Sequence, residues 1–161
     1  MKVLVISDSH GEGGLISKAF GIEMPDAVIF LGDGLSDFLE FRDYELRGNV
    51  NTYLVTGNCD TEYPDEYVYR QVAVIGGVRF FLTHGDRYNV RYDLTDLCSD
   101  AYSENCSIAL YGHTHVQKKS QVMGVTAVNP GALNRGDYAV ITTSGGKAEI
   151  SLRSLPFLKR V

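Results

Sequence analysis

The stretch that decides the fold is Val3-Leu4-Val5-Ile6-Ser7-Asp8-Ser9-His10-Gly11. Three of its four leading apolar residues are β-branched, which favours a buried strand, and that strand ends at a carboxylate and an imidazole. If the chain stays extended, Asp8 and His10 project to the same side. Two interpretations follow: a metal site at the carboxyl end of a strand, or a strand-to-helix turn in which Asp8 or Ser9 caps the next helix.

Two further apolar runs end at a polar turn of the same kind. Residues 27–31 lead into Gly32-Asp33-Gly34, where glycine on both sides lets the backbone turn sharply and approach a ligand closely. Residues 52–55 lead into Thr56-Gly57-Asn58-Cys59-Asp60. The first strand motif is therefore repeated twice within the first 60 residues of the chain.

Two helices are predicted between these strands. Apolar residues recur at helical spacing over 15–24, just before Pro25, and over 35–46, where they alternate with acidic residues. Strands that alternate with helices are typical of βαβ units, so we predict a parallel sheet in this half of the chain.

The second half has shorter elements separated by glycine turns. A hairpin is predicted over 67–75 and 78–83, then a weak helix over 90–105 and a strand over 107–111. A strand pair over 121–128 and a second hairpin over 138–143 and 148–152 follow. We expect the compact α/β protein to be parallel early and antiparallel late.

Composition indicates a soluble globular protein. With 161 residues, 44% of them apolar and 22% charged, the chain is predicted to form one domain, residues 1–161. The net charge of −5 argues against nonspecific nucleic-acid binding, and no nucleic-acid module is evident. The apolar run after Lys2 has four residues, too few for a signal peptide or a membrane span. Three cysteines without a CxxC motif suit a reducing cytoplasm, where we expect this protein.

All four histidines follow the ends of predicted strands. Oxygen-bearing side chains hold equivalent positions, which makes a set of seven ligand types: Asp8, His10, Asp33, Asn58, His84, His113 and His115. Seven ligands exceed the needs of one metal ion and match two. Imidazole and oxygen ligands without thiolates suit Mn, Fe, Ni or Zn. Taken singly, Asp8 and Asn58 are also good turn or cap residues, and His84 is an ordinary core or surface histidine.

The ordered set of motifs resembles that of the calcineurin-like metallophosphoesterases. Their pattern D-x-H, G-D, G-N-[HC]-[DE], H-G and G-H-x-H is matched by Asp8-Ser9-His10, Gly32-Asp33, Gly57-Asn58-Cys59-Asp60, His84-Gly85 and Gly112-His113-Thr114-His115. The resemblance runs from Val3 to Asn129-Pro130-Gly131 and is greatest to the small YfcE-type phosphodiesterases of bacteria and archaea. It implies a four-layer α/β/β/α sandwich of two mixed sheets.

The resemblance also implies a role for each matching residue. The roles are a first divalent ion held by Asp8, His10 and His115, a second held by Asn58, His84 and His113, and a bridge formed by Asp33. Mn²⁺ is the expected ion, with Ni²⁺, Fe²⁺ and Zn²⁺ as alternatives. Two such ions lower the pKa of a bridging water and neutralise charge on the phosphoryl oxygens during attack.

From the same resemblance we expect Asp33, Asn58 and His113 to be catalytic. Asn58 and Arg135 are expected to contact the substrate, a small phosphoester that is most simply a phosphodiester. Arg87 is the other basic residue close to the motifs, and each arginine is alternatively a solvated surface residue.

One position departs from the commonest form of the motif. Many relatives have histidine after the asparagine, where it protonates the leaving oxygen, whereas this chain has Cys59. A thiol with a reference pKa of ~8.5 is not the usual proton donor, which predicts a preference for phosphodiesters whose leaving group departs as a stable anion. No free base remains to activate Cys59 as a nucleophile, so we expect it to be structural.

Smaller predictions concern packing. Asp60 either orients a ligand or caps a turn. Cys98 and Cys106 are expected to pack beside a helix. The tyrosine cluster is predicted to form a packed strand face rather than a base-stacking platform, and it consists of Tyr63, Tyr67 and Tyr69.

Two other functions compete with that of a phosphodiesterase. The small metallophosphoesterase fold also serves protein assembly in the retromer subunit Vps29, and a phosphomonoesterase would use the same ligands. Vps29 departs from the family at the metal-site histidines, whereas all seven positions are filled here, which favours an enzyme. Exposed hairpin edges are compatible with a homodimer or homotetramer.

Overall fold

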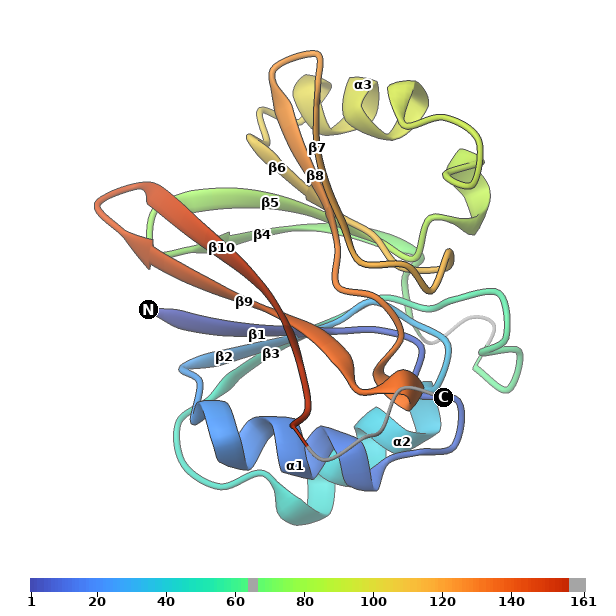
Figure 1. Cartoon of the computed structure of the whole chain (residues 1–161), viewed down its shortest axis with the longest axis vertical. Coiled ribbons are helices and arrows are strands. Elements are labelled where there is room, and N and C mark those ends of the chain that lie inside the picture. Colours follow the sequence, from blue (N-terminus) through green and yellow to red (C-terminus); the bar gives the residue numbers. More distant parts are fainter. Residues whose placement is uncertain (64–66, 157–161) are drawn as a thin grey trace.

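Two five-stranded sheets pack face to face in the computed structural model, which describes residues 1–63 and 67–156 (Figure 1). The first sheet consists, in spatial order, of β10 (Lys147–Ser154), β9 (Asp137–Ser144), β1 (Lys2–Ile6), β2 (Ala27–Phe30) and β3 (Asn51–Leu54). The second consists of β4 (Arg70–Ile75), β5 (Val78–Thr83), β6 (Ile108–Leu110), β8 (Val125–Asn129) and β7 (Lys118–Val122).

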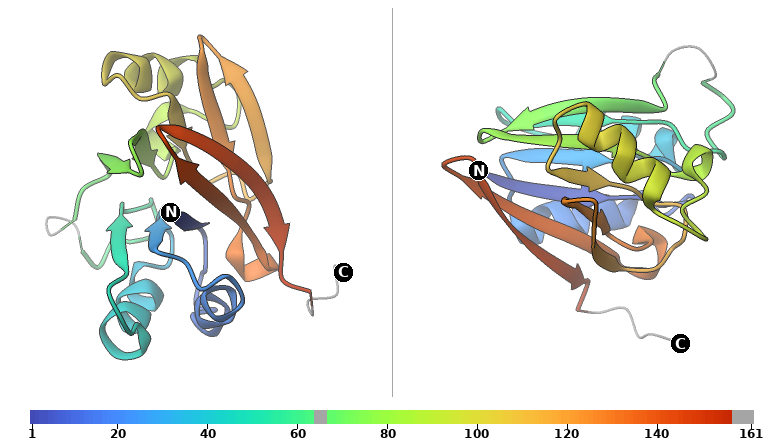
Figure 2. Two further views of the ribbon diagram at one scale, coloured as in Figure 1. Left: turned by 90° about the vertical axis from the view of Figure 1, so that its left-hand side faces the viewer. Right: turned by 90° about the horizontal axis from the view of Figure 1, so that it is seen from above.

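Helices cover the two outer faces. Helices α1 (Gly14–Glu23) and α2 (Leu35–Glu40) lie outside the first sheet, and α3 (Thr95–Ser103) lies outside the second (Figure 2). The α/β/β/α sandwich of two mixed sheets is thereby confirmed. Across residues 1–63 and 67–156, no helix is both long enough and apolar enough to cross a lipid bilayer.

Alternation along the strands divides the core into three clusters. In β1, Val3 and Val5 belong to the cluster between the sheets, whereas Leu4 and Ile6 belong to the cluster under α1 and α2. Phe81 of β5 belongs to the third cluster, under α3. Because β1 is buried on both faces, its sequence is an unbroken apolar run rather than an alternating one.

Each sheet has three parallel strands, and this symmetry was not foreseen. Strands β1, β2 and β3 are parallel neighbours, as predicted, but so are β5, β6 and β8. The expectation of an antiparallel second half is therefore wrong for the middle of the second sheet. The hairpin patterns at the edge strands of this sheet suggested antiparallel pairing, whereas the crossover through α3 makes β6 parallel to β5. Parallel strands have their carboxyl ends on the same side of a sheet, so the six turns that follow these strands gather there.

Several element boundaries also differ from the predictions. The helix expected over 35–46 is α2 followed by a π-helical turn, Phe41–Glu45, and the helix expected over 90–105 begins only at Thr95. The hairpin expected from residue 67 begins at Arg70, because the Val68 carbonyl accepts a hydrogen bond from Thr56 instead of pairing with β5. The tyrosines before Arg70 therefore do not form one strand face, which corrects that prediction.

The edge strand β7 begins earlier than expected. It starts at Lys118 rather than at residue 121, and its first residues are polar and largely exposed. They lack the apolar alternation on which a strand prediction depends. The pairing of Lys118 with Asn129 of β8 nevertheless extends the ladder to the turn that follows β6.

Candidate metal centre

The turn after β1 does not continue the strand. Asp8 has φ 57° and His10 has φ 45°, both left-handed, so the premise of an extended chain is wrong at these residues. The His10 amide donates to the Asp33 carbonyl at 3.3 Å, which ties this turn to the turn after β2. Helix α1 is capped by Gly13, so the alternative in which Asp8 or Ser9 caps the next helix is also wrong.

Left-handed backbone recurs at the strand-end turns. The non-glycine residues with positive φ include five of the seven predicted ligands: Asp8, His10, Asp33, His113 and His115. Such conformations cost on the order of 1 kcal/mol or more for each residue and cluster at functional sites, where the surrounding structure enforces them. The chain is thus strained where its chemistry is concentrated.

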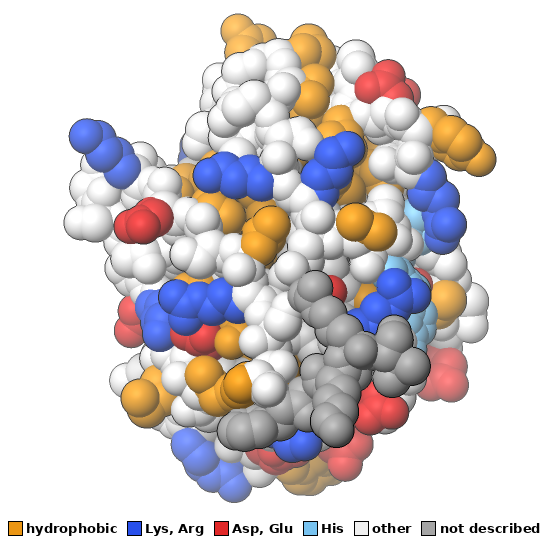
Figure 3. Space-filling model, in the orientation of Figure 1, with side chains coloured by type: hydrophobic (Ala, Val, Ile, Leu, Met, Phe, Trp, Pro, Cys, Tyr) orange, Lys and Arg blue, Asp and Glu red, His pale blue; other side chains and the backbone are white. Residues whose placement is uncertain are grey.

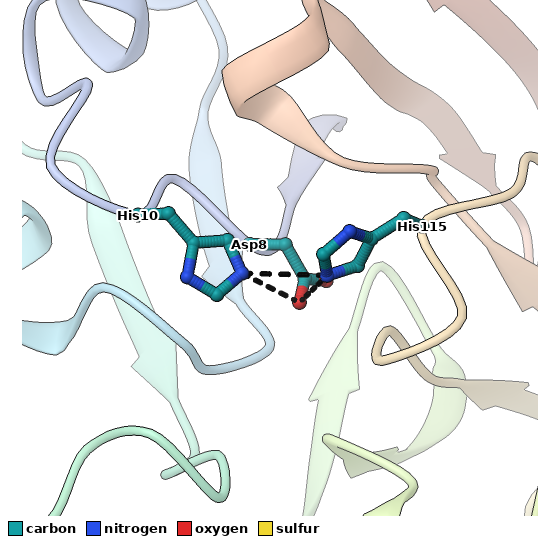
Figure 4. Close-up of side chains that lie close together, drawn as sticks. All are labelled: Asp8, His10 and His115. Atoms are coloured by element: carbon teal, nitrogen blue, oxygen red, sulfur yellow. Dashed lines mark hydrogen bonds and ion pairs between the residues drawn. The ribbon is translucent and has the colours of Figure 1, made fainter.

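Asp8, His10 and His115 converge from two turns onto one point (Figure 4). The Asp8 Oδ1 atom lies 3.0 Å from His115 Nε2 and 3.6 Å from His10 Nε2, and the two Nε2 atoms are 3.3 Å apart. Ligand atoms that bind one cation at about 2.0–2.2 Å lie roughly 3.0–3.5 Å from each other, so this triangle has the dimensions of one face of a metal coordination sphere.

Asp33, His84 and His113 form a second group of ligand atoms within 4.8 Å of one another. The Leu31 carbonyl lies 2.8 Å from His84 Nδ1, which places the proton there and leaves the Nε2 lone pair facing the group. Burial favours the neutral imidazole, but the carboxylates of Asp33 and Asp8 outweigh it and raise the pKa of His84.

Asp33 lies between the two groups. Its Oδ2 atom is 3.2 Å from His84 Nε2 and 4.0 Å from His10 Nε2, and its Oδ1 atom accepts a hydrogen bond from the Cys59 amide at 2.8 Å. Burial opposes ionisation of Asp33, but the His84 imidazole and the Cys59 amide outweigh it and lower the pKa to about 2. This carboxylate is therefore ionised at neutral pH.

The donor atoms fit divalent ions. Among the described residues, Asp8 Oδ1 and His84 Nε2 are buried and make no hydrogen bond of good geometry. The polar atoms beside them belong to other predicted ligands, His115 Nε2 at 3.0 Å from Asp8 Oδ1 and Asp33 Oδ2 at 3.2 Å from His84 Nε2. A buried polar atom without a partner costs about 1–3 kcal/mol, and a cation would supply one to both. The other Asp8 oxygen, Oδ2, is held away by the Ser7 hydroxyl at 2.6 Å and the His113 amide at 3.2 Å.

Three polar side chains outside the ligand set hold the turns in place. Asp60 accepts four backbone N–H bonds around Asp33, so it both orients a predicted ligand and caps a turn. Asp37 of α2 accepts from the Ser9 hydroxyl at 2.6 Å and from the Gly11 amide. Buried Asn129 donates to the Gly112 carbonyl at 2.8 Å. Asp37 and Asn129 were not predicted, because no local pattern shows what they contact.

Two glycines allow the turns to approach one another. A Cβ atom at Gly57 would overlap the Asp33 carboxylate, and one at Gly112 would overlap Ser7 Oγ and lie 2.8 Å from Asp8 Oδ2. The glycines that precede Asn58 and His113 in the motifs are thus required by close packing of one strand-end turn on the next.

The remaining predicted residues are exposed. Asn58 and Cys59 are exposed, with the Asn58 amide 3.5 Å from Cys59 Sγ, and burial together with Asp33 raises the pKa of the thiol. Arg135 is exposed in the 3₁₀ turn Leu133–Arg135, which follows β8. In Figure 3 the pale-blue histidines are visible at the surface, beside blue Lys or Arg side chains.

Arg91 contacts the predicted ligand His113, and the sequence did not predict this contact. Its Nε atom donates to His113 Nε2 at 3.2 Å, and burial, His84 and Arg91 together lower the pKa of His113. A neutral imidazole has one lone pair, so His113 cannot accept this bond and bind a cation at the same time. Arg91 lies in a turn ahead of α3 that carries no motif.

A sandwich with carboxylate and imidazole side chains gathered at one strand edge is the architecture of a metal-dependent hydrolase. The chain belongs to the calcineurin-like phosphoesterase superfamily, whose domain model matches residues 1–145. A probable metallophosphoesterase of Mycoplasma pneumoniae is 30% identical over 135 residues, which are 82% of this chain and 79% of the relative. The predicted family is confirmed.

Two similar solved structures come from proteins of different kinds. An archaeal phosphodiesterase is 24% identical with a TM-score of 0.66, and the match covers 95% of this chain and all of the other. Vps29 of Entamoeba histolytica, solved in complex with Zn²⁺, is 18% identical with a TM-score of 0.72, covering 96% of this chain and 99% of the other. At these identities the likeness concerns the fold alone.

Proposed function

We propose that this phosphoesterase is a phosphodiesterase with two divalent ions. Asp8, His10 and His115 would hold the first ion, Asn58, His84 and His113 the second, and Asp33 would contact both. The observation that carries the proposal is the pair of buried atoms without a hydrogen bond of good geometry, Asp8 Oδ1 and His84 Nε2, which face the same centre. Mn²⁺ is the ion we propose first, with Ni²⁺, Fe²⁺ and Zn²⁺ compatible with the same ligands.

Bound divalent ions supply Lewis-acid chemistry, since they make water acidic near neutral pH and offset the charge of the phosphoryl oxygens. The residues of this chain would orient the ions and the substrate. Asp33 stays ionised and is fixed by the Cys59 amide, and His84 is fixed by the Leu31 carbonyl. Asn58 and Arg135, both exposed, are proposed to contact the phosphoryl oxygens, and His113 to assist catalysis.

The leaving group is the basis for proposing diesters. The Cys59 thiol, with its raised pKa, is protonated at neutral pH but is a weaker acid than an imidazolium. Esters whose leaving group departs as a stable anion need little help from such an acid. Aryl diesters should therefore be better substrates than alkyl monoesters.

The test compares hydrolysis of bis-p-nitrophenyl phosphate with that of p-nitrophenyl phosphate. Metal-stripped protein is reconstituted with Mn²⁺, Ni²⁺, Zn²⁺ or Mg²⁺, beside Asp33→Asn and, as a matched control, Asp96→Asn on the exposed first turn of α3. We expect metal-dependent turnover that favours the diester, loses at least a hundred-fold in Asp33→Asn and is retained in Asp96→Asn. Faster turnover of the monoester would instead indicate a phosphomonoesterase.

A protein-interaction scaffold is the second candidate function. Its support is the likeness in fold to Vps29, including a Vps29 solved with Zn²⁺, so metal binding alone does not separate the two functions. Stoichiometric binding of two ions without turnover of either ester would favour the scaffold. We further propose that the protein is cytoplasmic, since all three of its cysteines are free thiols.

A further inference from the structure

A pocket opens beside the candidate metal centre. It has a volume of about 270 Å³ and is formed by the turn after β3, the residue before β4 (Tyr69) and the turn after β5. Asp60 lines this pocket and accepts a hydrogen bond from the Asp33 amide at 2.8 Å, so the pocket lies next to the centre. Asn58, a proposed ligand of the second ion, lines it as well. Its other side chains include Tyr63, Tyr69, Asp86 and Arg87.

Arg87 is fixed at the wall of the pocket. Its Cζ atom lies 4.1 Å from the centre of the Tyr69 ring, a cation–π contact. A guanidinium stacked on a ring still donates hydrogen bonds in its own plane, so Arg87 can bind a further group while Tyr69 holds it. Sequence reasoning treated Arg87 as one of two basic residues near the motifs and predicted substrate contact for Arg135 instead.

The rest of the lining combines aromatic surface with hydrogen-bonding groups. Tyr63 adds a second phenol ring, and Asp86 adds a carboxylate that accepts hydrogen bonds. Asp60 also lines the pocket, but its oxygens already accept four backbone N–H bonds. Stacking surfaces next to a guanidinium and a carboxylate suit a planar heteroaromatic group with donors and acceptors on its edge.

We propose that this pocket is a subsite for a planar heteroaromatic ester group, such as a nucleoside, of a small phosphodiester. The inference rests on the proposed function, because a phosphoryl group at the centre places one of its ester groups next to Asn58. A volume of about 270 Å³ accommodates one such group, and the net charge of −5 disfavours a long polyanion. Arg87 and Tyr69 are the specificity-determining residues.

The experiment uses two esters with the same leaving group, thymidine 5′-monophosphate p-nitrophenyl ester and methyl p-nitrophenyl phosphate. For the metal-loaded enzyme we expect kcat/KM to be about ten-fold or more higher for the nucleoside ester, which is the size of one stacking contact. Arg87→Gln and Tyr69→Ala should bring this ratio near one. Arg47→Gln and Tyr44→Ala, exposed residues of the same types, should leave the ratio unchanged. A wild-type ratio near one, or a ratio unaffected by Arg87→Gln and Tyr69→Ala, would overturn the proposal.

A binding measurement separates this proposal from the proposed function. If the metal-loaded protein hydrolyses neither ester, the phosphodiesterase is refuted, and calorimetric titration with thymidine 5′-monophosphate then tests the pocket itself. Binding that weakens about ten-fold or more in Arg87→Gln and Tyr69→Ala supports the subsite. Absent binding, or equal binding by wild type and both variants, overturns it.

Discussion

The replacement Asp60→Asn tests how the second strand-end turn is built. Asp60 Oδ2 accepts from the Asp33 and Gly57 amides at 2.8 Å, and Oδ1 accepts from the Gly34 and Leu35 amides at 2.9 Å. Asparagine keeps one acceptor oxygen and replaces the other with an NH₂ group. Two of the four backbone donors then lose their acceptor and face another donor.

The expected cost follows from those two lost bonds. Leaving a buried donor unsatisfied costs about 1–3 kcal/mol, and Asp60 is half-buried, so the free energy of unfolding should fall by about 2–4 kcal/mol. For a chain of this length that is a decrease in Tm of roughly 5–15 °C. Because the turn also carries Asp33, metal affinity should fall as well.

The measurement is urea and thermal unfolding in the presence of a chelator, so that metal binding does not contribute to stability. Asp96→Asn, an exposed carboxylate on α3, serves as the control and should stay within about 0.5 kcal/mol of wild type. If Asp60→Asn were equally neutral in the metal-free protein, the four-bond description of this turn would be wrong.

Two further predictions concern Glu23 and Arg91. Burial disfavours the charged Glu23 carboxylate, but hydrogen bonds from Lys2, from a tyrosine hydroxyl and from Arg153 outweigh it and lower its pKa. Glu23→Gln should therefore lower the free energy of unfolding by about 1–3 kcal/mol at pH 7. This difference from wild type should shrink as the pH falls below the ordinary pKa of 4.5 and through the lowered pKa. A difference that does not vary with pH in urea unfolding would contradict this. Arg91→Gln removes the donor that occupies the His113 lone pair, so the Mn²⁺ concentration at half-saturation should fall by about 2–10-fold in calorimetry. Weaker Mn²⁺ binding by this variant would contradict the prediction.

The strand ends and the family were readable from local patterns. A β-branched apolar run followed by Asp8, or by Asp33, signals a buried strand and a polar turn within a few residues. The parallel pairing in the second sheet was not readable, because α3 separates β5 from β6 along the chain and the edge strand β7 separates β6 from β8. Their direction depends on pairing between distant segments, which no local pattern records.

The sequence by itself determined which residue types stand at the strand ends, since these follow from hydrophobic periodicity and glycine placement along one segment. The family resemblance also placed Asp8 with His115 and Asp33 between the two groups. Only the tertiary structure decided the distances, such as 3.0 Å between Asp8 Oδ1 and His115 Nε2, and the contact of Arg91 with His113. The physical reason is that these contacts join residues far apart in the chain. They form only when both sheets are packed and left-handed turns, costly in isolation, are held by their neighbours.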